Sequence, residues 1–152
     1  MSPARSTTRA RWLTYGLSRL FLLRGNIHRH FGNISGERRE YQWAVDRFSR
    51  AIEIDPQYVA AYYSRGVLYW RELENWHRAV NDLTRVIELA PHWTEAWFNR
   101  AIAQQRRGNF EAAITDLETY LTIATDPGWR ANAERQLELM KAVNAEKTAR
   151  HA

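Results

Sequence analysis

Residues 61–91 read AYYSRGVLYWRELENWHRAVNDLTRVIELAP, and residues 96–125 read AWFNRAIAQQRRGNFEAAITDLETYLTIAT. When the two segments are aligned, small, aromatic and large apolar residues recur 34 or 35 positions apart. A third copy, GNIHRHFGNISGERREYQWAVDRFSRAIEIDP, occupies residues 25–56 and matches best in its second half. A repeat of this length predicts a solenoid, in which each unit buries its apolar face only against its neighbours.

Four positions of the repeat carry most of the pattern. An aromatic residue is followed by an alanine and then by a large apolar residue, and the first two copies end in proline. These residues are Tyr41, Ala44, Phe48 and Pro56, then Trp76, Ala79, Leu83 and Pro91, then Phe110, Ala113 and Leu117. Small residues let two helices approach closely, and proline stops a helix because it lacks an N–H group. Each copy therefore predicts two helices joined by a short turn.

The spacing between copies changes at one place. Gly32 and Gly66 are 34 residues apart, whereas Tyr41 and Trp76 are 35 residues apart. The extra residue therefore lies between Gly66 and Trp76. Because surface turns tolerate insertions and packed helices do not, we expect it in the turn at residues 72–75.

This pattern resembles the tetratricopeptide repeat (TPR) family over residues 25–125. The resemblance implies an all-α, right-handed superhelical solenoid of helix-turn-helix repeats, in which the first helix of each repeat lines a concave groove. We expect an extra helix before the repeats and a capping helix after them. The corresponding segments are a basic tail and amphipathic helix at 1–24, TPR units at 25–58, 59–93 and 94–127, and a C-terminal capping helix and tail at 128–152.

The capping helix is predicted over about residues 129–148. Pro127 suits the first turn of a helix, and Asp126 suits the capping position before it. The end of the third repeat would be covered by an apolar stripe of Trp129, Ala133, Leu137 and Met140.

The N-terminal segment is basic and amphipathic. Residues 1–36 contain six arginines and no acidic residue, while the rest of the chain holds 16 basic and 17 acidic residues. Apolar residues at helical spacing predict a helix over residues 8–24, with Gly25 just after its end and Asn26 capping the next helix. The residues expected to make its contacts are Arg11, Trp12, Leu13, Leu17, Arg19, Leu20 and Phe21.

Three roles for this helix remain open: a cap on the first repeat, an amphipathic helix lying on an anionic membrane, and a docking helix for another protein. The apolar run is too short to span a bilayer and contains Arg19. We expect a cytoplasmic protein, with association at the cytoplasmic face of a membrane as one alternative. Organelle import is another, because an arginine-rich start without acidic residues is typical of transit peptides.

The resemblance also implies the residues of the groove. Carried over by position, the partner-binding set is Arg29, Asn33, Tyr63, Trp70, Arg71, Phe98, Asn99 and Arg106. Aromatic residues and arginine are the usual anchors of interfaces, and we interpret Tyr63, Trp70 and Phe98 as side chains that the packing between helices does not need. The family's clamp for a C-terminal carboxylate is incomplete, because Glu95 stands where a cation is expected and would repel a carboxylate.

No catalytic constellation appears in the sequence. There is no cysteine, no phosphate-binding loop and no nucleophile motif, and His28 and His30 have no third ligand at metal spacing. We therefore expect a non-enzyme without a cofactor or metal: a scaffold or adaptor that binds a peptide or helix of another protein. The first alternative is a peripheral subunit or assembly factor of a membrane complex, attached through residues 8–24. The second is an RNA-binding helical repeat, disfavoured by the near-neutral charge of the repeats.

Overall fold

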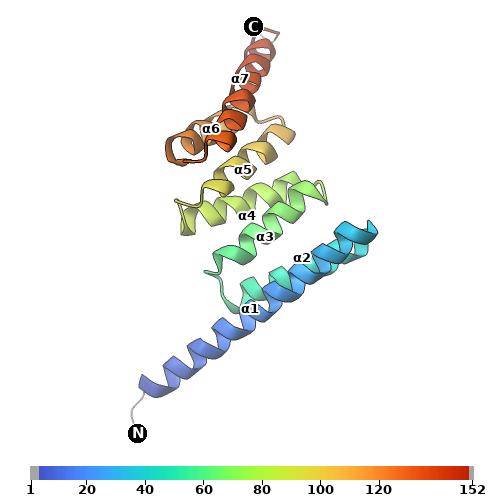
Figure 1. Ribbon diagram of the computed structural model, residues 1–152, viewed down its shortest axis with the longest axis vertical. Coiled ribbons are helices and arrows are strands. Elements are labelled where there is room, and N and C mark those ends of the chain that lie inside the picture. Colours follow the sequence, from blue (N-terminus) through green and yellow to red (C-terminus); the bar gives the residue numbers. More distant parts are fainter. Residues whose placement is uncertain (1–3, 151–152) are drawn as a thin grey trace.

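The computed structural model describes the backbone of residues 4–150 and the side chains from residue 12 to residue 150. Within that part all regular secondary structure is helical, without strands. The helices are α1 (Ala4–Ser35), α2 (Arg38–Ile54), α3 (Val59–Arg71), α4 (Trp76–Leu89), α5 (Thr94–Arg106), α6 (Phe110–Ile123) and α7 (Pro127–Ala149) (Figure 1). The predicted all-α repeat fold is confirmed.

The helices form three hairpin pairs, α1–α2, α3–α4 and α5–α6, and α7 packs on α6. Figure 1 shows the pairs stacked along the long axis of the molecule, with the two chain ends at opposite ends of the stack. The contacts are mainly between helices adjacent in sequence, as expected for a solenoid. The three repeated alanines, Ala44, Ala79 and Ala113, are completely buried, which confirms the alignment of the repeats.

The turns account for the change in repeat spacing. Residues 72–75 separate α3 from α4, whereas only residues 107–109 separate α5 from α6. In both turns an asparagine caps the following helix: the Asn75 side chain accepts a hydrogen bond from the Arg78 N–H, and Asn109 accepts one from the Ala112 N–H. The predicted position of the extra residue is confirmed.

The predicted helix break at Gly25–Asn26 is wrong, because α1 runs without interruption from Ala4 to Ser35. The separate N-terminal helix and the first helix of unit one are a single element. Gly25 is buried against the ring of Phe48, and a Cβ atom added at Gly25 would lie 2.6 Å from Phe48 Cδ1. Glycine is thus present because α2 approaches closely, and not because the chain turns.

An ion pair that the sequence analysis did not detect is repeated in the second and third units, and its arginine also reaches the preceding unit. The Arg65 guanidinium donates from Nε and Nη2 to the two carboxylate oxygens of Asp82, each at 2.8 Å, and from Nη1 to Ser49 Oγ at 2.8 Å. Arg65 on α3 therefore binds α4 of its own pair and α2 of the preceding pair. Such two-pronged bonds fix both distance and direction.

The next unit repeats this arrangement one period later. Arg100 on α5 bonds both oxygens of Asp116 on α6, at 2.8 and 2.6 Å, and donates to Thr84 Oγ1 on α4 at 3.0 Å. The first unit lacks the pair, because the aligned positions hold Phe31 and Arg47. Arg47 Nε is buried without a hydrogen-bond partner.

Candidate functional site

The first helices of the three pairs, α1, α3 and α5, bring charged and polar side chains together around the Tyr63 phenol. Asn99 Nδ2 on α5 donates to the Tyr63 hydroxyl oxygen at 3.0 Å. Burial and then the negative charge of Glu95 raise the pKa of Tyr63, while Asn99, Arg71 and Arg29 act in the opposite direction. We call these five residues the Tyr63 cluster; four of them belong to the predicted groove.

The interpretation of the groove aromatics as side chains that packing does not need is wrong. The Tyr63 ring lies 5.2 Å from the Trp93 ring, and the Phe98 ring lies 5.4 Å from Tyr120 and 5.9 Å from Trp129. Phe98 thus packs toward α6 and α7. Aromatic side chains are large enough to contact a neighbouring helix even when their backbone lies at the edge of the groove.

Trp70 also packs in the interior, where its half-buried ring touches two separate groups of core residues. Its indole N–H is buried and has no hydrogen-bond partner. The Arg71 guanidinium carbon lies 5.6 Å from the centre of this ring, close enough for a cation–π contact, and the Arg71 side chain is exposed.

The remaining predicted groove residues lie at the two ends of this face. Asn33, exposed near the end of α1, accepts a hydrogen bond from the Tyr41 hydroxyl at 3.2 Å and so helps to join α1 to α2. Arg106 is exposed in the last turn of α5. Glu95, in the first turn of α5, is exposed as well, and its charge acts on both Tyr63 and Tyr120.

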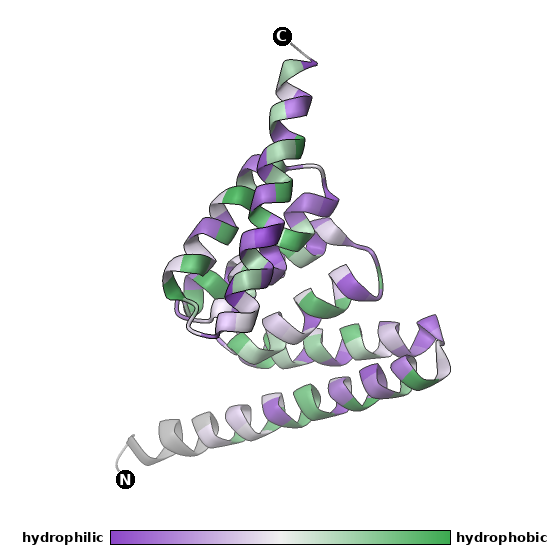
Figure 2. Ribbon diagram, turned by 45° about the horizontal axis from the view of Figure 1, so that its top comes forward, coloured by the Kyte–Doolittle hydropathy of each residue, from purple (hydrophilic) through white to green (hydrophobic). Residues whose placement is uncertain are grey.

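The N-terminal half of α1 exposes most of the side chains predicted to make contacts there. Trp12 and Leu13 are 69% and 71% exposed, Leu17 and Leu20 are also exposed, and Phe21 is half-buried. Arg19 lies over the Tyr15 ring, with its guanidinium carbon 4.5 Å from the ring centre; the side chain of Arg11 lies outside the described residues. Figure 2 shows hydrophobic and hydrophilic residues interspersed along α1.

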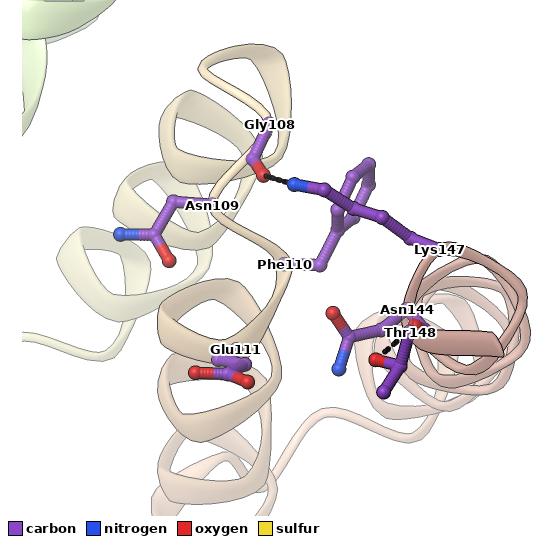
Figure 3. Close-up of a pocket in the computed structure, with 7 residues that line it drawn as sticks. All are labelled: Gly108, Asn109, Phe110, Glu111, Asn144, Lys147 and Thr148. Atoms are coloured by element: carbon purple, nitrogen blue, oxygen red, sulfur yellow. Dashed lines mark hydrogen bonds between the residues drawn. The ribbon is translucent and has the colours of Figure 1, made fainter. Parts of the chain in front are cut away.

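A pocket of about 470 Å³ lies elsewhere, between the turn before α6 and the end of α7 (Figure 3). Its lining residues are Gly108, Asn109, Phe110, Glu111, Asn144, Lys147 and Thr148. The Lys147 ammonium donates to the Gly108 carbonyl at 3.4 Å and lies 5.8 Å from the centre of the Phe110 ring. None of the predicted groove or N-terminal contact residues lines this pocket.

The described residues contain neither a metal-binding cluster nor a membrane-spanning helix. No three His, Cys, Asp or Glu side chains among residues 12–150 come together in a way that could hold a metal ion. In the same part of the chain, no helix combines the length and the apolar character needed to cross a bilayer.

Comparison with known sequences identifies two family matches. A sequence model described as "Tetratricopeptide repeat" matches residues 71–142, and one described as "TPR repeat" matches residues 32–72. No curated protein sequence matches the chain.

Solved structures share the fold at low sequence identity. The first TPR domain of human RPAP3 is 20% identical with a TM-score of 0.72, covering 88% of this chain and 96% of that one. The second TPR domain of human RPAP3, in complex with an HSP70 peptide, is 22% identical with a TM-score of 0.67, covering 82% and 98%. The Yersinia enterocolitica type III secretion translocator chaperone SycD is 16% identical with a TM-score of 0.70, covering 85% and 86%.

Proposed function

Because this chain belongs to the tetratricopeptide repeat family, we propose that it is a non-enzymatic cytoplasmic scaffold or adaptor, which binds a peptide or helix of a partner on the face formed by α1, α3 and α5. The observation that carries this proposal is the Tyr63 cluster. Asn99 of α5 donates a hydrogen bond to the phenol of Tyr63 on α3, and the charges of Glu95 on α5, Arg71 on α3 and Arg29 on α1 act on the pKa of that phenol. Such a cluster offers both hydrogen-bond donors and acceptors to a chain lying across the helices.

The solved neighbours support peptide binding as the general mode. One of them, the second TPR domain of human RPAP3, was solved with the HSP70 peptide SGPTIEEVD. In this chain the exposed carboxylate of Glu95 lies on the same face as Arg29 and Arg71. A peptide carboxylate placed beside Glu95 would be repelled by it. We therefore propose a partner segment with apolar side chains rather than an acidic C-terminus.

The groove is tested best with substitutions that leave the aromatic packing intact. Replacing Tyr63, Trp70 and Phe98 together would remove ring contacts between units, so loss of binding could follow from unfolding. The double variant Arg71→Ala with Asn99→Ala removes one guanidinium and one amide from the groove and few apolar contacts. We expect affinity for the partner to fall by about tenfold, because arginine anchors commonly contribute more than 1 kcal/mol at interfaces.

The measurement is capture of the tagged protein's partners from its own organism by quantitative mass spectrometry, followed by titration of the recovered partner. Arg50→Ala, on the outer helix α2, is the matched control, since Arg50 is exposed and pairs only with Glu53 in its own helix. Equal capture by the groove variant and the control would show that the α1–α3–α5 face is not the binding site.

A second candidate is a peripheral subunit or assembly factor of a membrane complex, attached through residues 8–24. The specific observation in its favour is that exposed Trp12, Leu13 and Leu17 lie on a stretch of α1 that contains no acidic residue. Arginines near an anionic surface contribute roughly 1 kcal/mol each, and this attraction is screened by salt.

This candidate predicts membrane association that weakens as salt rises and disappears when residues 1–16 are removed. The deletion stops at residue 16 because Ser18 is buried and Leu22 packs on the core, so a longer deletion would damage the fold. The measurement is sedimentation with native membranes at low and high salt. Recovery of the full-length protein in the supernatant at low salt would contradict the candidate.

A further inference from the structure

The outer side of α1 carries a line of exposed apolar side chains. Nine of the twelve exposed large hydrophobic residues in the described part of the chain belong to α1. Six of them are separated by three, four or seven residues and so lie on one side of the helix: Leu13, Leu17, Leu20, Ile27, Phe31 and Ile34. We call these six residues the α1 seam. A line of exposed apolar side chains on one helix is a candidate interaction site.

The seam does not overlap the proposed groove. Arg29 is nine residues from Leu20, which is about two and a half turns of helix, so the two side chains leave α1 on opposite sides. Leu13 to Ile34 spans roughly 30 Å along the helix axis. The seam is therefore long enough to accommodate a helix of several turns without disturbing the Tyr63 cluster.

The repeat alignment shows what kind of element fits the seam. Ile27, Phe31 and Ile34 align with Ala61, Arg65 and Leu68 of α3, and with Ala96, Arg100 and Ala103 of α5. In α5 these positions face the second helix of the preceding pair. Ala96 packs with Leu83, Val86 and Ile87 of α4, and Arg100 bonds Thr84 of α4.

The same positions of α3 face α2. Arg65 reaches Ser49 of α2, and Leu68 is buried in a cluster that includes Phe48 of α2. Ile27, Phe31 and Ile34 thus occupy the side on which every later first helix receives a preceding helix, yet they are 45%, 54% and 71% exposed. The side of α1 that corresponds to the packing face of α3 and α5 is therefore exposed.

The spacing of the seam also favours a helix over a lipid surface. Leu13, Leu20, Ile27 and Ile34 lie seven residues apart, and Leu17 and Phe31 lie between them at the steps typical of a coiled-coil seam, with exposed Trp12 and Leu23 beside it. The position between Leu20 and Ile27 that would complete the pattern holds Arg24, which is exposed. A helix lying in a membrane interface uses a broader apolar face, with its charges on the opposite side.

Charge decides between a second copy and a different partner. Residues 4–36 contain no acidic side chain, and Arg19 and Arg24 are exposed beside or within the seam. Two α1 helices packed together would bring arginines near arginines without a compensating carboxylate, and like charges across an interface are costly. We propose that the α1 seam docks an amphipathic helix of another protein, one whose apolar stripe is flanked by Asp or Glu.

This inference goes beyond the proposed groove function, because the seam and the Tyr63 cluster can be altered separately. It also differs from the second candidate, because it names a protein helix rather than lipid as the partner of α1. Failure of the helix to bind would leave the groove prediction untouched, and membrane binding by the same residues would support the second candidate alone.

The test uses the full-length protein and three synthetic helical peptides, which all share the same heptad pattern of leucine and isoleucine. The residues flanking the pattern are Glu in the first peptide, Gln in the second and Lys in the third. We expect the Glu peptide to bind at least about tenfold more tightly than the Lys peptide in fluorescence anisotropy titrations. The variant Arg24→Glu should reverse this order.

The apolar contribution is tested by Ile27→Ser with Phe31→Ser, which should abolish binding of the Glu peptide without adding a repelling charge. Both residues are exposed, so the fold should be retained, and Leu139→Ser on α7 is a matched control because Leu139 is 53% exposed outside the seam. Equal affinity for all three peptides, or no effect of the seam variant, would overturn the proposal. Binding to phosphatidylglycerol–phosphatidylcholine vesicles without peptide binding, or a seam-dependent dimer in sedimentation, would overturn it too.

Discussion

Replacing Asp116 by alanine is expected to lower the free energy of unfolding by about 3–5 kcal/mol, because it removes one partner of a buried ion pair. The Asp116 and Arg100 side chains are 4% and 16% exposed, and their two hydrogen bonds are 2.6 and 2.8 Å long. In the variant the Arg100 guanidinium would stay largely out of water with only Thr84 as a side-chain acceptor. Such a loss is a large share of the 5–15 kcal/mol typical of a domain.

The measurement is urea unfolding followed by circular dichroism. Glu88→Ala is the matched control, since Glu88 pairs at 2.9 Å with Arg85 but both side chains are well exposed, and surface pairs of this kind contribute less than about 1 kcal/mol. The double variant Arg100→Met with Asp116→Leu should recover much of the loss, because no unpaired charge remains buried. Equal effects of Asp116→Ala and Glu88→Ala would show that water screens the inner pair.

Phe48→Ala is expected to destabilise the protein by about 3–5 kcal/mol, the usual cost of removing a buried phenylalanine ring. Phe48 on α2 is completely buried and belongs to the same cluster as Leu68 and Tyr69 of α3. It also fills the space left by Gly25 on α1. A single ring thus joins the first helix, its partner and the following unit, so its removal leaves a cavity that no one helix can close.

The pairing of Phe48 with Gly25 can be measured in a double-mutant cycle. In the wild-type background, Gly25→Ala should cost about 1–3 kcal/mol because the added methyl group overlaps the ring. In the Phe48→Ala background this cost should vanish, and the helix-forming preference of alanine should contribute up to about 1 kcal/mol in favour of folding. Additive effects would mean that the methyl group and the ring do not meet.

Residue spacing predicted much of the fold because the repeat pattern is local. Ala79 and Leu83 have counterparts at the same positions of the first and third repeats. The one-residue change in repeat spacing predicted the four-residue turn before Trp76. Gly25 misled the sequence interpretation. A glycine followed by asparagine is typical both of a helix end and of a close helix contact, and only the position of Phe48 distinguishes the two.

That the groove residues bind a partner stays a prediction. Asn99 donates a hydrogen bond to Tyr63, and the charges of Arg29 and Arg71 act on the pKa of Tyr63, whereas Phe98 turns toward α6 and α7. The side of a helix on which a residue lies follows from sequence periodicity. How deeply a large ring is buried depends on the size of residues from other units, such as Tyr120, that no local pattern specifies.

The amino-acid order alone was sufficient for the number of repeats, their helical content and their turns, because each of these depends on residues within about one repeat length. The Arg65–Asp82 and Arg100–Asp116 pairs, the continuity of α1 and the exposure of its outer seam became visible only in three dimensions. Each of these features depends on how closely separate helices pack and on which of their faces meet. That outcome is set jointly by side chains from several helices, and no single segment of the chain contains it.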